Sequence, residues 1–376
     1  MVRPFWVTKI HEKWREKSVV WLTGVRRSGK TTLCQSLTPK AYYDCELPRI
    51  RQALEDPEAF FKDQTEVAIT LDEIHRLDNA AEVLKIAADH FPKLRVIATG
   101  SSTLAAGKKF KDSLTDRKRT LFLPPIPCFE LKVFNQSLED RLLRGGLPPF
   151  LLAKGFPESG YQDWIDSYWA KDIQELFRIE KRAAFLKFVE LLALQSGGMF
   201  QANSFSTPCG VSHTTIASYL DALEQTHVAG VLRPYAKNPS KEIVSTPKVF
   251  FFDTGFVNFF QGVDQLHPTR KGHLWEHLVY NELLTMVEKT EIHYWRDKSK
   301  NEVDFVVKRR GAPPVAIECK SKFKDFDPHS IQKFRNQHPE GKNLVVAMDL
   351  STRVRKSFDT FEVTGISIAG LRAALA

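Results

Sequence analysis

Short apolar runs alternate with helix-like stretches along the first third of the chain. Five of these runs have the length and composition of strands: "VVWLTG", "AYYDC", "VAITLDE", "RVIATGSS" and "TLFLPPI". Between two of them, "DNAAEVLKIAADHF" has helical character. This alternation predicts a mainly parallel sheet with helices on both faces. Since the prolines of "LPPIP" break regular structure, we expect the first domain to cover residues 1–127.

Residues 128–240 have a helical pattern. The run "FLKFVELLALQSG" predicts an apolar helix that ends at two glycines. The stretch "GVSHTTIASYLDALEQTHVAGVL" predicts the second part of a helix-turn-helix, and "VLRPYAK" predicts a wing strand. Ser212, His213, Thr214 and Thr215 could lie on DNA in such a unit. Helix pairs of this kind also serve as packing adapters between domains, and we favour that simpler interpretation.

Strands return over residues 241–376, in "KVFFFDTG", "IHYW", "EVDFVV", "PVAIECK" and "NLVVAMD". The helix-like stretch "GHLWEHLVYNELLTMV" precedes the last four. Residues two apart in a strand face the same side, so Glu318 and Lys320 point together while Cys319 points away. Asp304 lies on the preceding strand and pairs with them across a turn. Asp304 and Glu318 could therefore hold Mg²⁺, and Lys320 could orient a water or stabilise a phosphate.

The octapeptide "GVRRSGKT" (residues 24–31) fits the pattern G-x-x-x-x-G-K-[ST] between an apolar strand and a helix. Glycines let backbone N–H groups surround phosphates, and the amino end of the helix adds its positive dipole. Lys30 would reach the β- and γ-phosphates of ATP, and the Thr31 hydroxyl would hold Mg²⁺. The other expected nucleotide contacts are Gly24, Gly29 and Thr32. A glycine-rich turn without a ligand is the alternative, but the flanking elements argue against it.

Two acidic residues follow the strand run "VAITL". Asp72 ends that strand, where the metal-binding Walker-B aspartate of a P-loop ATPase belongs. Glu73 beside it would orient the attacking water. An acidic pair at a strand end could instead cap the following helix, but the P-loop upstream favours catalysis.

Polar residues also mark the next two strands. Ser101 or Ser102 could sense the γ-phosphate, although a serine at a strand end is also common as a helix cap. Arg117 and Arg119 lie just before the last strand, from which an arginine could reach the nucleotide of a neighbouring subunit. An exposed basic loop explains these arginines equally well, so a homo-oligomer is one of two alternatives.

Composition adds a partner class and a compartment. The chain has 376 residues, of which 43% are hydrophobic and 26% charged, as expected for two or three soluble domains. Its net charge of +9 favours a polyanionic partner, DNA in particular, and the basic runs "KRR" and "KSKFK" lie in the carboxyl-terminal part. The five cysteines lack CxxC spacing, which predicts buried free thiols. Since no run resembles a signal peptide or a membrane span, we expect a cytoplasmic protein.

These motifs together resemble those of the prokaryotic AAA-type ATPases that carry a carboxyl-terminal domain of unknown function with a nuclease-like fold. The similar stretches run in order along nearly the whole chain: "VVWLTGVRRSGKTTL", "YYDCE", "LEDPEAFF", "ITLDEIHRL", "VIATGSSTL", "SLTDRKRTLFLPPI", "RGGLPPF", "SHTTIASYLDALEQT", "KVFFFDTG", "GHLWEHLVYNEL" and "YWRDKSKNEVDFVV…AIECKS". The resemblance implies an α/β fold class, with an N-terminal P-loop AAA-type parallel sheet, a helical winged-helix-like middle and a C-terminal restriction-endonuclease-like α/β domain. Arg117 matches the arginine that this family places before a strand, although "LTD" precedes it here and His75 follows "DEI" where glutamine is usual.

The carboxyl-terminal part also resembles the PD-(D/E)XK nucleases. This resemblance implies that Asp304, Glu318 and Lys320 are catalytic. Glu276 matches an upstream acidic residue of that superfamily and is a further candidate metal ligand, and Glu302 could substitute or assist. An E-x-K element is weak alone, but here it follows a strand and a helix that each carry an acid. Nuclease-like domains can keep these residues and serve only for binding.

The sequence thus predicts a Mg²⁺-dependent ATPase coupled to a nuclease-like, DNA-interacting carboxyl-terminal domain. One alternative is a nucleotide-gated interaction switch whose nuclease fold is inert. Another is a DNA-binding regulator that acts through the winged helix.

Overall fold

The computed structural model describes residues 3–37, 41–100, 112, 114–236 and 246–376. Contacts divide the chain into two compact units, the first made of Met1–Pro124, Ser167–Arg178 and Gln225–His227. The second unit contains Pro125–Asp166, Ile179–Glu224 and Val228–Ala376. Two short segments of the predicted helical region therefore belong to the first unit. The expected domain boundaries after residues 127 and 240 remain a prediction from the sequence.

The first unit contains the expected parallel sheet. All four neighbouring pairs in the order β2-β3-β4-β1-β5 are parallel. The strands are β1 (Val19–Thr23), β2 (Ala41–Asp44), β3 (Ala68–Asp72), β4 (Arg95–Thr99) and β5 (Lys118–Phe122). Each coincides with one of the five apolar runs, so the α/β fold class is confirmed. Because the strands are parallel, their carboxyl ends meet at one edge of the sheet.

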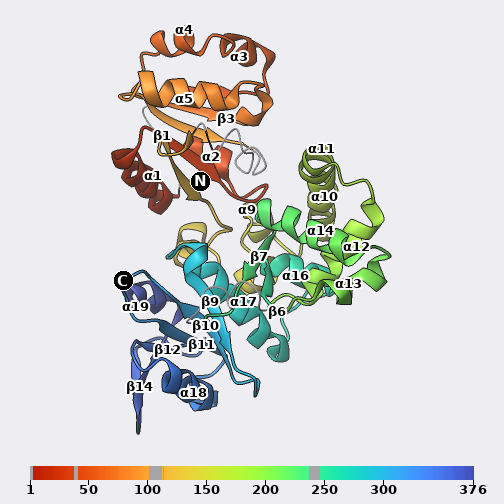
Figure 1. The fold of residues 1–376 in the computed structure, drawn as a ribbon, viewed down its shortest axis with the longest axis vertical. Coiled ribbons are helices and arrows are strands. Elements are labelled where there is room, and N and C mark those ends of the chain that lie inside the picture. The colour runs from red at the N-terminus through yellow and green to blue at the C-terminus, as the bar shows by residue number, and fades with distance from the viewer. Residues whose placement is uncertain (1–2, 38–40, 101–111, 113, 237–245) are drawn as a thin grey trace. The chain divides into compact units, whose positions relative to one another are not determined.

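Alternate residues of β1 face two different hydrophobic cores. Val19 and Trp21 pack on one side, together with side chains of the helices α3 (Pro48–Ala53), α4 (Pro57–Lys62) and α5 (Ala80–His90). Val20 and Leu22 pack on the other side, against α1 (Pro4–Glu16) and α2 (Lys30–Gln35). Figure 1 shows these two helical layers. A strand covered on both faces needs apolar residues throughout, which explains the uninterrupted run "VVWL".

The helical part of the second unit contains the expected helix pair. Gly210, at φ 65°, ends α13 (Ala202–Cys209), and α14 (His213–Gln225) follows after a short turn. A three-stranded antiparallel sheet, in the order β6-β8-β7, consists of β6 (Gly198–Met199), β8 (Lys248–Phe251) and β7 (Ala229–Leu232). Among the described residues between 125 and 260, the other helices of the second unit are η2 (Cys128–Phe134), α8 (Leu138–Arg144), α9 (Pro148–Leu151), α10 (Glu158–Tyr168), α12 (Arg182–Leu194) and α16 (Thr254–Phe260). The last two residues of α10 belong to the first unit, as do η3 (Trp169–Gln174) and α11 (Glu175–Phe177).

The second unit also contains a mixed six-stranded sheet, in the order β13-β14-β12-β11-β10-β9. Its strands are β9 (Ile292–Arg296), β10 (Glu302–Val307), β11 (Val315–Lys320), β12 (Asn343–Ala347), β13 (Val354–Phe358) and β14 (Phe361–Ile366). The helix α17 (Lys271–Leu283) packs against β11, and α18 (His329–Gln337) packs against β10 (Figure 1). The chain ends in α19 (Leu371–Leu375). Within the described ranges, no helix combines the length and apolar character that crossing a membrane requires.

A β-bulge interrupts β10 beside its acidic residue. The register of β10 with β9 shifts between Val303 and Val306, and both valines join the hydrophobic core of α18. Phe305 instead stacks on Tyr280 of α17, with ring centroids 6.2 Å apart. Asp304 interacts electrostatically with a carboxylate of α17. Because of the bulge, the side chains of β10 do not alternate strictly between the two faces of the sheet. Asp304 and Phe305, although adjacent in sequence, therefore both interact with α17.

A fully buried ion pair joins three separated segments of the second unit. Arg141 of α8 and Asp253, which precedes α16, have no exposed side-chain surface, and Nη1 lies 3.5 Å from Oδ2. The guanidinium also donates to Ile126 O (2.7 Å), to Thr254 Oγ1 (3.1 Å) and to Asn281 Oδ1 (3.2 Å). The arginine thus connects α8 to α16 and to α17.

Backbone groups complete the partners of the Asp253 carboxylate. It accepts hydrogen bonds from Gly146 N (2.7 Å) and Gly255 N (2.9 Å). A Cβ at Gly145, where φ is 71°, would lie 1.6 Å from Asp253 Oδ1. The glycines of "RGGLPPF" and the aspartate of "KVFFFDTG" therefore serve one packing arrangement, which explains both stretches without a ligand.

Replacing Asp253 by alanine is expected to lower the free energy of unfolding by about 3–5 kcal/mol, because Arg141 would remain buried without its counter-charge. The measurement is urea unfolding followed by circular dichroism. The exposed pair Arg182–Asp166, with side chains 53% and 47% exposed, is the matched control. Asp166→Ala should cost less than about 1 kcal/mol. Equal losses in the two variants would contradict this account of the buried pair.

Candidate functional sites

The P-loop adopts a backbone conformation that glycine alone accommodates at its first position. Gly24 has φ 150°, and a Cβ there would lie 2.4 Å from Leu123 O. Gly29, at φ 94°, directly precedes α2. The Lys30 ammonium donates to Gly24 O (2.9 Å) and Val25 O (3.1 Å), so it lies over the loop. Thr32 is the next helical residue after Thr31.

Asp72 connects the P-loop to two neighbouring strands. Thr31 Oγ1 donates to Asp72 Oδ2 at 2.9 Å, which brings the two predicted halves of the nucleotide site together. The carboxylate also accepts from Tyr42 of β2 and Thr99 of β4. Sequence reasoning missed both of these residues. Their positions near the carboxyl ends of adjacent parallel strands are the signal that could have found them.

Glu73, which follows Asp72, has a fixed backbone and a partly exposed carboxylate. Its backbone is left-handed (φ 52°), and its N–H donates to Thr99 Oγ1 at 3.1 Å. The carboxylate is 38% exposed and lies 3.1 Å from His75 Nδ1. Burial acts to raise the pKa of Glu73, but the contact with His75 and the charge of Lys30 lower it below its ordinary value. A carboxylate at this position is therefore ionised and reachable by water.

A segment from outside the amino-terminal region contributes charge beside the P-loop. Asp172, in η3, accepts from Arg26 Nε at 2.8 Å, and the two side chains are 19% and 28% exposed. Burial lowers the pKa of Lys30, while Glu73 and Asp172 act in the opposite direction. Asp172 is thus close enough to the P-loop to act on its lysine, and no sequence motif indicated this.

Two further contacts within the first unit involve its two short segments, residues 167–178 and 225–227. His227 Nε2 lies 2.8 Å from Thr23 Oγ1, next to the first glycine of the P-loop, and its ring contacts Phe122. Tyr168 and Thr226 share a buried hydrogen bond of 2.6 Å. The two short segments of the first unit are therefore joined to each other, and the one that contains His227 is joined to β1.

The predicted arginines have intrachain partners. Arg117 Nε donates to Asp89 Oδ1 at 2.7 Å, and Arg119 Nε donates to Glu16 Oε2 at 2.5 Å. Both side chains are about one third exposed. Their proposed action on a neighbouring subunit stays a prediction. Ser101 and Ser102 lie outside the described residues.

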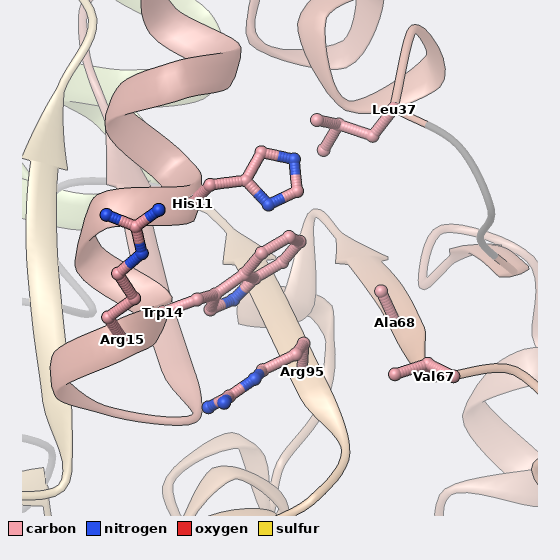
Figure 2. A pocket seen from close by; sticks show the side chains of 7 residues that line it. All are labelled: His11, Trp14, Arg15, Leu37, Val67, Ala68 and Arg95. Atoms are coloured by element: carbon pink, nitrogen blue, oxygen red, sulfur yellow. The ribbon is translucent and has the colours of Figure 1, made fainter.

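A cavity lies at the amino ends of the parallel strands, away from the predicted nucleotide site. A cavity of about 510 Å³ is lined by His11, Trp14, Arg15, Leu37, Val67, Ala68 and Arg95 (Figure 2). Trp14 forms part of its wall and donates through Nε1 to Val96 O at 3.2 Å. Since Ala68 and Arg95 begin β3 and β4, this cavity lies at the sheet edge opposite Asp72.

The carboxyl-terminal acids and lysine converge as expected. In β10 and β11, the pairing of Phe305 with Ile317 places Asp304 beside Glu318. Asp304 Oδ2 accepts from Cys319 N (2.7 Å), and Lys320 Nζ donates to Glu318 Oε2 (2.8 Å). The cluster is therefore formed by two antiparallel strands, one acid from each.

Burial and crowding act together on these acids. Burial, reinforced by the charge of Asp304, raises the pKa of Glu318 to about 8. Burial and the same neighbour raise the pKa of Glu276 to about 7. Burial also raises the pKa of Asp304. Burial is thus the largest cause for all three carboxylates, and the charge of Asp304 adds to it for Glu276 and Glu318.

Sequence reasoning missed a second lysine in this cluster. Lys248 of β8 is buried, and its Nζ lies 3.2 Å from Glu276 Oε1 and 2.5 Å from Glu302 Oε1. Among the residues that the structure describes, no group of three or more Asp, Glu, His or Cys side chains is arranged to hold a metal ion. Glu276 therefore lies where it was expected, but its visible partner is an ammonium group.

The helix-turn-helix residues have a structural role. Thr215 N donates to Ser212 Oγ at 3.1 Å, which caps the amino end of α14. Ser212 Oγ also lies within hydrogen-bond distance of the hydroxyls of Thr214 and Thr215. His213 is exposed. The capping explains three of the four polar residues without DNA.

The first unit combines a five-stranded parallel sheet with a glycine-rich loop between β1 and α2, and its sequence is similar to a known family. Residues 16–132 match a family model described as AAA domain. Residues 135–267 and 271–367 match two models described as domains of unknown function (DUF8612 and DUF4143). These two matches name no activity, so the resemblance of the carboxyl-terminal part to nucleases stays a prediction from the sequence.

Similar whole proteins include an uncharacterized protein of Mycobacterium tuberculosis (Rv2008c) and one of Mycobacterium bovis (Mb2031c). Each is 29% identical over 306 residues, covering 78% of this chain and 68% of the relative. Among solved structures, the Saccharomyces cerevisiae Hsp104–ADP complex is 15% identical with a TM-score of 0.28, over 59% of this chain and only 39% of that one. A Bacillus subtilis DNA clamp loader delta protein is 12% identical with a TM-score of 0.27, over 58% of this chain and 88% of that one. Structural likeness this low carries no argument about function.

Asp172→Asn is expected to tighten nucleotide binding by about fivefold, because it removes a negative charge that acts beside the phosphate-binding loop. The measurement is the Kd of a fluorescent ATP analogue. Glu175→Gln is the matched control, since Glu175 lies nearby in the same segment but pairs loosely with Arg76 (3.8 Å), outside the loop. Unchanged affinity in Asp172→Asn, or an equal gain in the control, would count against this electrostatic role.

Proposed function

We propose that this chain is a Mg²⁺-dependent ATPase coupled to a nuclease-like, DNA-interacting carboxyl-terminal module. The observation that carries the ATPase part is the 2.9 Å hydrogen bond between Thr31 and Asp72. It places a hydroxyl and a carboxylate, the two protein ligands expected for Mg²⁺ in a P-loop site, at one point beside the loop. The pair fits a hard cation that prefers oxygen ligands.

Each residue of the first site has a separate task. The amides of the glycine-rich loop bind the phosphates, and the Lys30 ammonium exchanges its loop carbonyls for phosphate oxygens. Glu73, ionised and partly exposed, accepts a hydrogen bond from the attacking water and orients it. Bound Mg²⁺ would neutralise charge that develops on the phosphates. Thr99 holds both Asp72 and the Glu73 amide, so it positions the two acids relative to each other.

Arg117 and Arg119 would act only in an oligomer. To reach a neighbouring nucleotide, each would have to leave a carboxylate of its own chain, Asp89 or Glu16. Both pairs are partly exposed, so that exchange costs little. We keep the homo-oligomer as part of the proposal on this basis.

Lys30→Ala should weaken ATP binding about 10- to 100-fold, because a charged hydrogen-bond donor to the phosphates is lost. Glu73→Gln should bind ATP nearly as well but hydrolyse it at least about 100-fold more slowly, because the water loses its acceptor. The measurements are equilibrium binding and steady-state phosphate release, with and without DNA. Parent protein that releases no phosphate under any of these conditions would remove the ATPase proposal.

The proposed nuclease activity is supported by a buried carboxylate oxygen, Oε1 of Glu318, that accepts no hydrogen bond from the described residues. Glu318 is 4% exposed, and its Oε1 has no hydrogen-bond partner among the described residues, although Oε2 is held by Lys320. A buried carboxylate oxygen without a donor is costly, which favours a cation or water as its natural partner. With Asp304 beside it, this arrangement fits one divalent ion, which keeps most of its coordination for water and phosphate. The chain's net charge of +9 would attract the DNA backbone.

An inert nuclease fold remains the second candidate function. The observation that favours it is the lysine pairing of the cluster, since Lys248 and Lys320 both neutralise acids without a metal ion. In that case the nucleotide state would control an interaction rather than a cleavage.

Cleavage of linear, branched and single-stranded DNA with Mg²⁺ or Mn²⁺ separates the two candidates. Asp304→Ala, Glu318→Ala and Lys320→Ala should each abolish cleavage, whereas ATP hydrolysis should stay near the parent rate. Lys356→Ala is the matched control, because Lys356 is an exposed lysine of β13, an edge strand of the same sheet that is not next to β11. Absence of cleavage by the parent on every substrate would leave the interaction switch as the better description.

A further inference from the structure

Lys248 belongs to neither strand of the predicted nuclease motif, yet it lies inside the acidic cluster. It comes from β8, the central strand of the small antiparallel sheet, and it is 4% exposed. Its ammonium lies 2.5 Å from Glu302 Oε1 and 3.2 Å from Glu276 Oε1. One lysine therefore bridges an acid of α17 and an acid of β10.

The charge on this lysine is secure. Burial acts to lower the pKa of Lys248, but Glu276 and Glu302 outweigh burial and raise it well above its ordinary value. The ring of Tyr294 also lies 5.7 Å from the ammonium nitrogen. Lys248 is thus a permanent, buried cation whose position is set by two carboxylates.

The other half of the cluster is differently arranged. Asp304 accepts a backbone hydrogen bond, and Glu318 is held by Lys320 through one oxygen only. The second oxygen of Glu318 is buried and has no partner in the described part of the chain. The acceptor capacity that remains for a ligand therefore lies with Asp304 and Glu318, away from the oxygens that Lys248 occupies.

A divalent ion cannot share the Lys248 side of the cluster. A ligand oxygen of Glu276 or Glu302 would need to lie about 2.1 Å from Mg²⁺, while the ammonium already lies against the same two carboxylates. A Mg²⁺ ion and the Lys248 ammonium bound to the same carboxylate would lie close together, and they would repel each other strongly because the surroundings exclude water.

We propose that Lys248 takes the place of one divalent cation in this cluster, so that the site binds a single Mg²⁺ or Mn²⁺ through Asp304 and Glu318. The inference rests on the proposed metal site and deepens it. Lys248 excludes a second ion from Glu276 and Glu302, and it supplies there the positive charge that a second ion would bring. Glu276, expected from the sequence to bind metal, instead positions Lys248.

The test is titration of the full-length, EDTA-treated, nucleotide-free protein with Mn²⁺ by isothermal calorimetry. The parent is expected to bind one Mn²⁺ per chain, and Glu318→Gln should lose this ion. Lys248→Met keeps the length of the side chain but removes its charge, and it should bind two. Lys271→Met is the matched control, because Lys271 pairs only loosely with Glu139 (3.7 Å), away from the cluster, and should bind one.

Glu276→Gln provides a second test, which can still be carried out if the Lys248→Met variant does not fold. Because Glu276 is not a ligand in this account, the variant should still bind one Mn²⁺, with a Kd within about threefold of the parent. Loss of the ion in Glu276→Gln, a parent stoichiometry of two, or a stoichiometry of one in folded Lys248→Met would each overturn the inference and leave the proposed metal site in place. A parent that binds no Mn²⁺ would instead remove the proposed metal site itself, and the inference with it.

Discussion

A charge buried inside a protein needs a partner of opposite charge or a full set of hydrogen bonds, and this constraint shapes both units of the chain. In the first unit, Asp72 is 3% exposed and is held by three hydroxyl groups. In the second unit, the pair Arg141–Asp253 is fully buried and joins segments far apart in the sequence. The acidic cluster obeys the same rule with lysines as partners. Each partnership also fixes the position of a strand or helix end, so structure and chemistry have a common cause.

Residues beyond the region that matches the AAA domain contact the P-loop and the strand before it. Asp172 and His227 lie within residues 135–267, which match a different family model, yet both contact the P-loop or the strand before it. Asp172 is linked to Arg26 of the loop, and His227 to Thr23. The first unit therefore includes two short segments of the region that matches a different family model.

The acidic cluster shows how the same motif residues can have different consequences. Asp304, Glu318 and Lys320 meet as an E-x-K motif requires. Whether such a cluster binds two ions, one or none depends on which cations the rest of the fold already places there. Here Lys248 arrives from a separate sheet and neutralises Glu276 and Glu302. Glu318 retains an unsatisfied oxygen, and this imbalance is the physical basis for proposing a metal ion at one end of the cluster only.

The sequence by itself determined the features that depend on near neighbours along the chain. Apolar runs marked all five strands of the parallel sheet, the P-loop followed from its glycine spacing, and alternation placed Glu318 and Lys320 on one side. Periods of two and about 3.6 residues are properties of the local backbone, so they can be read without knowing the fold. Tertiary structure alone decided that Tyr42 and Thr99 hold Asp72, that Asp172 reaches the P-loop, and that Lys248 enters the acidic cluster. It also placed a bulge in β10, against strict alternation. These contacts join residues that are tens to hundreds of positions apart, and their pairing depends on strand order and packing, which leave no periodic trace in the sequence.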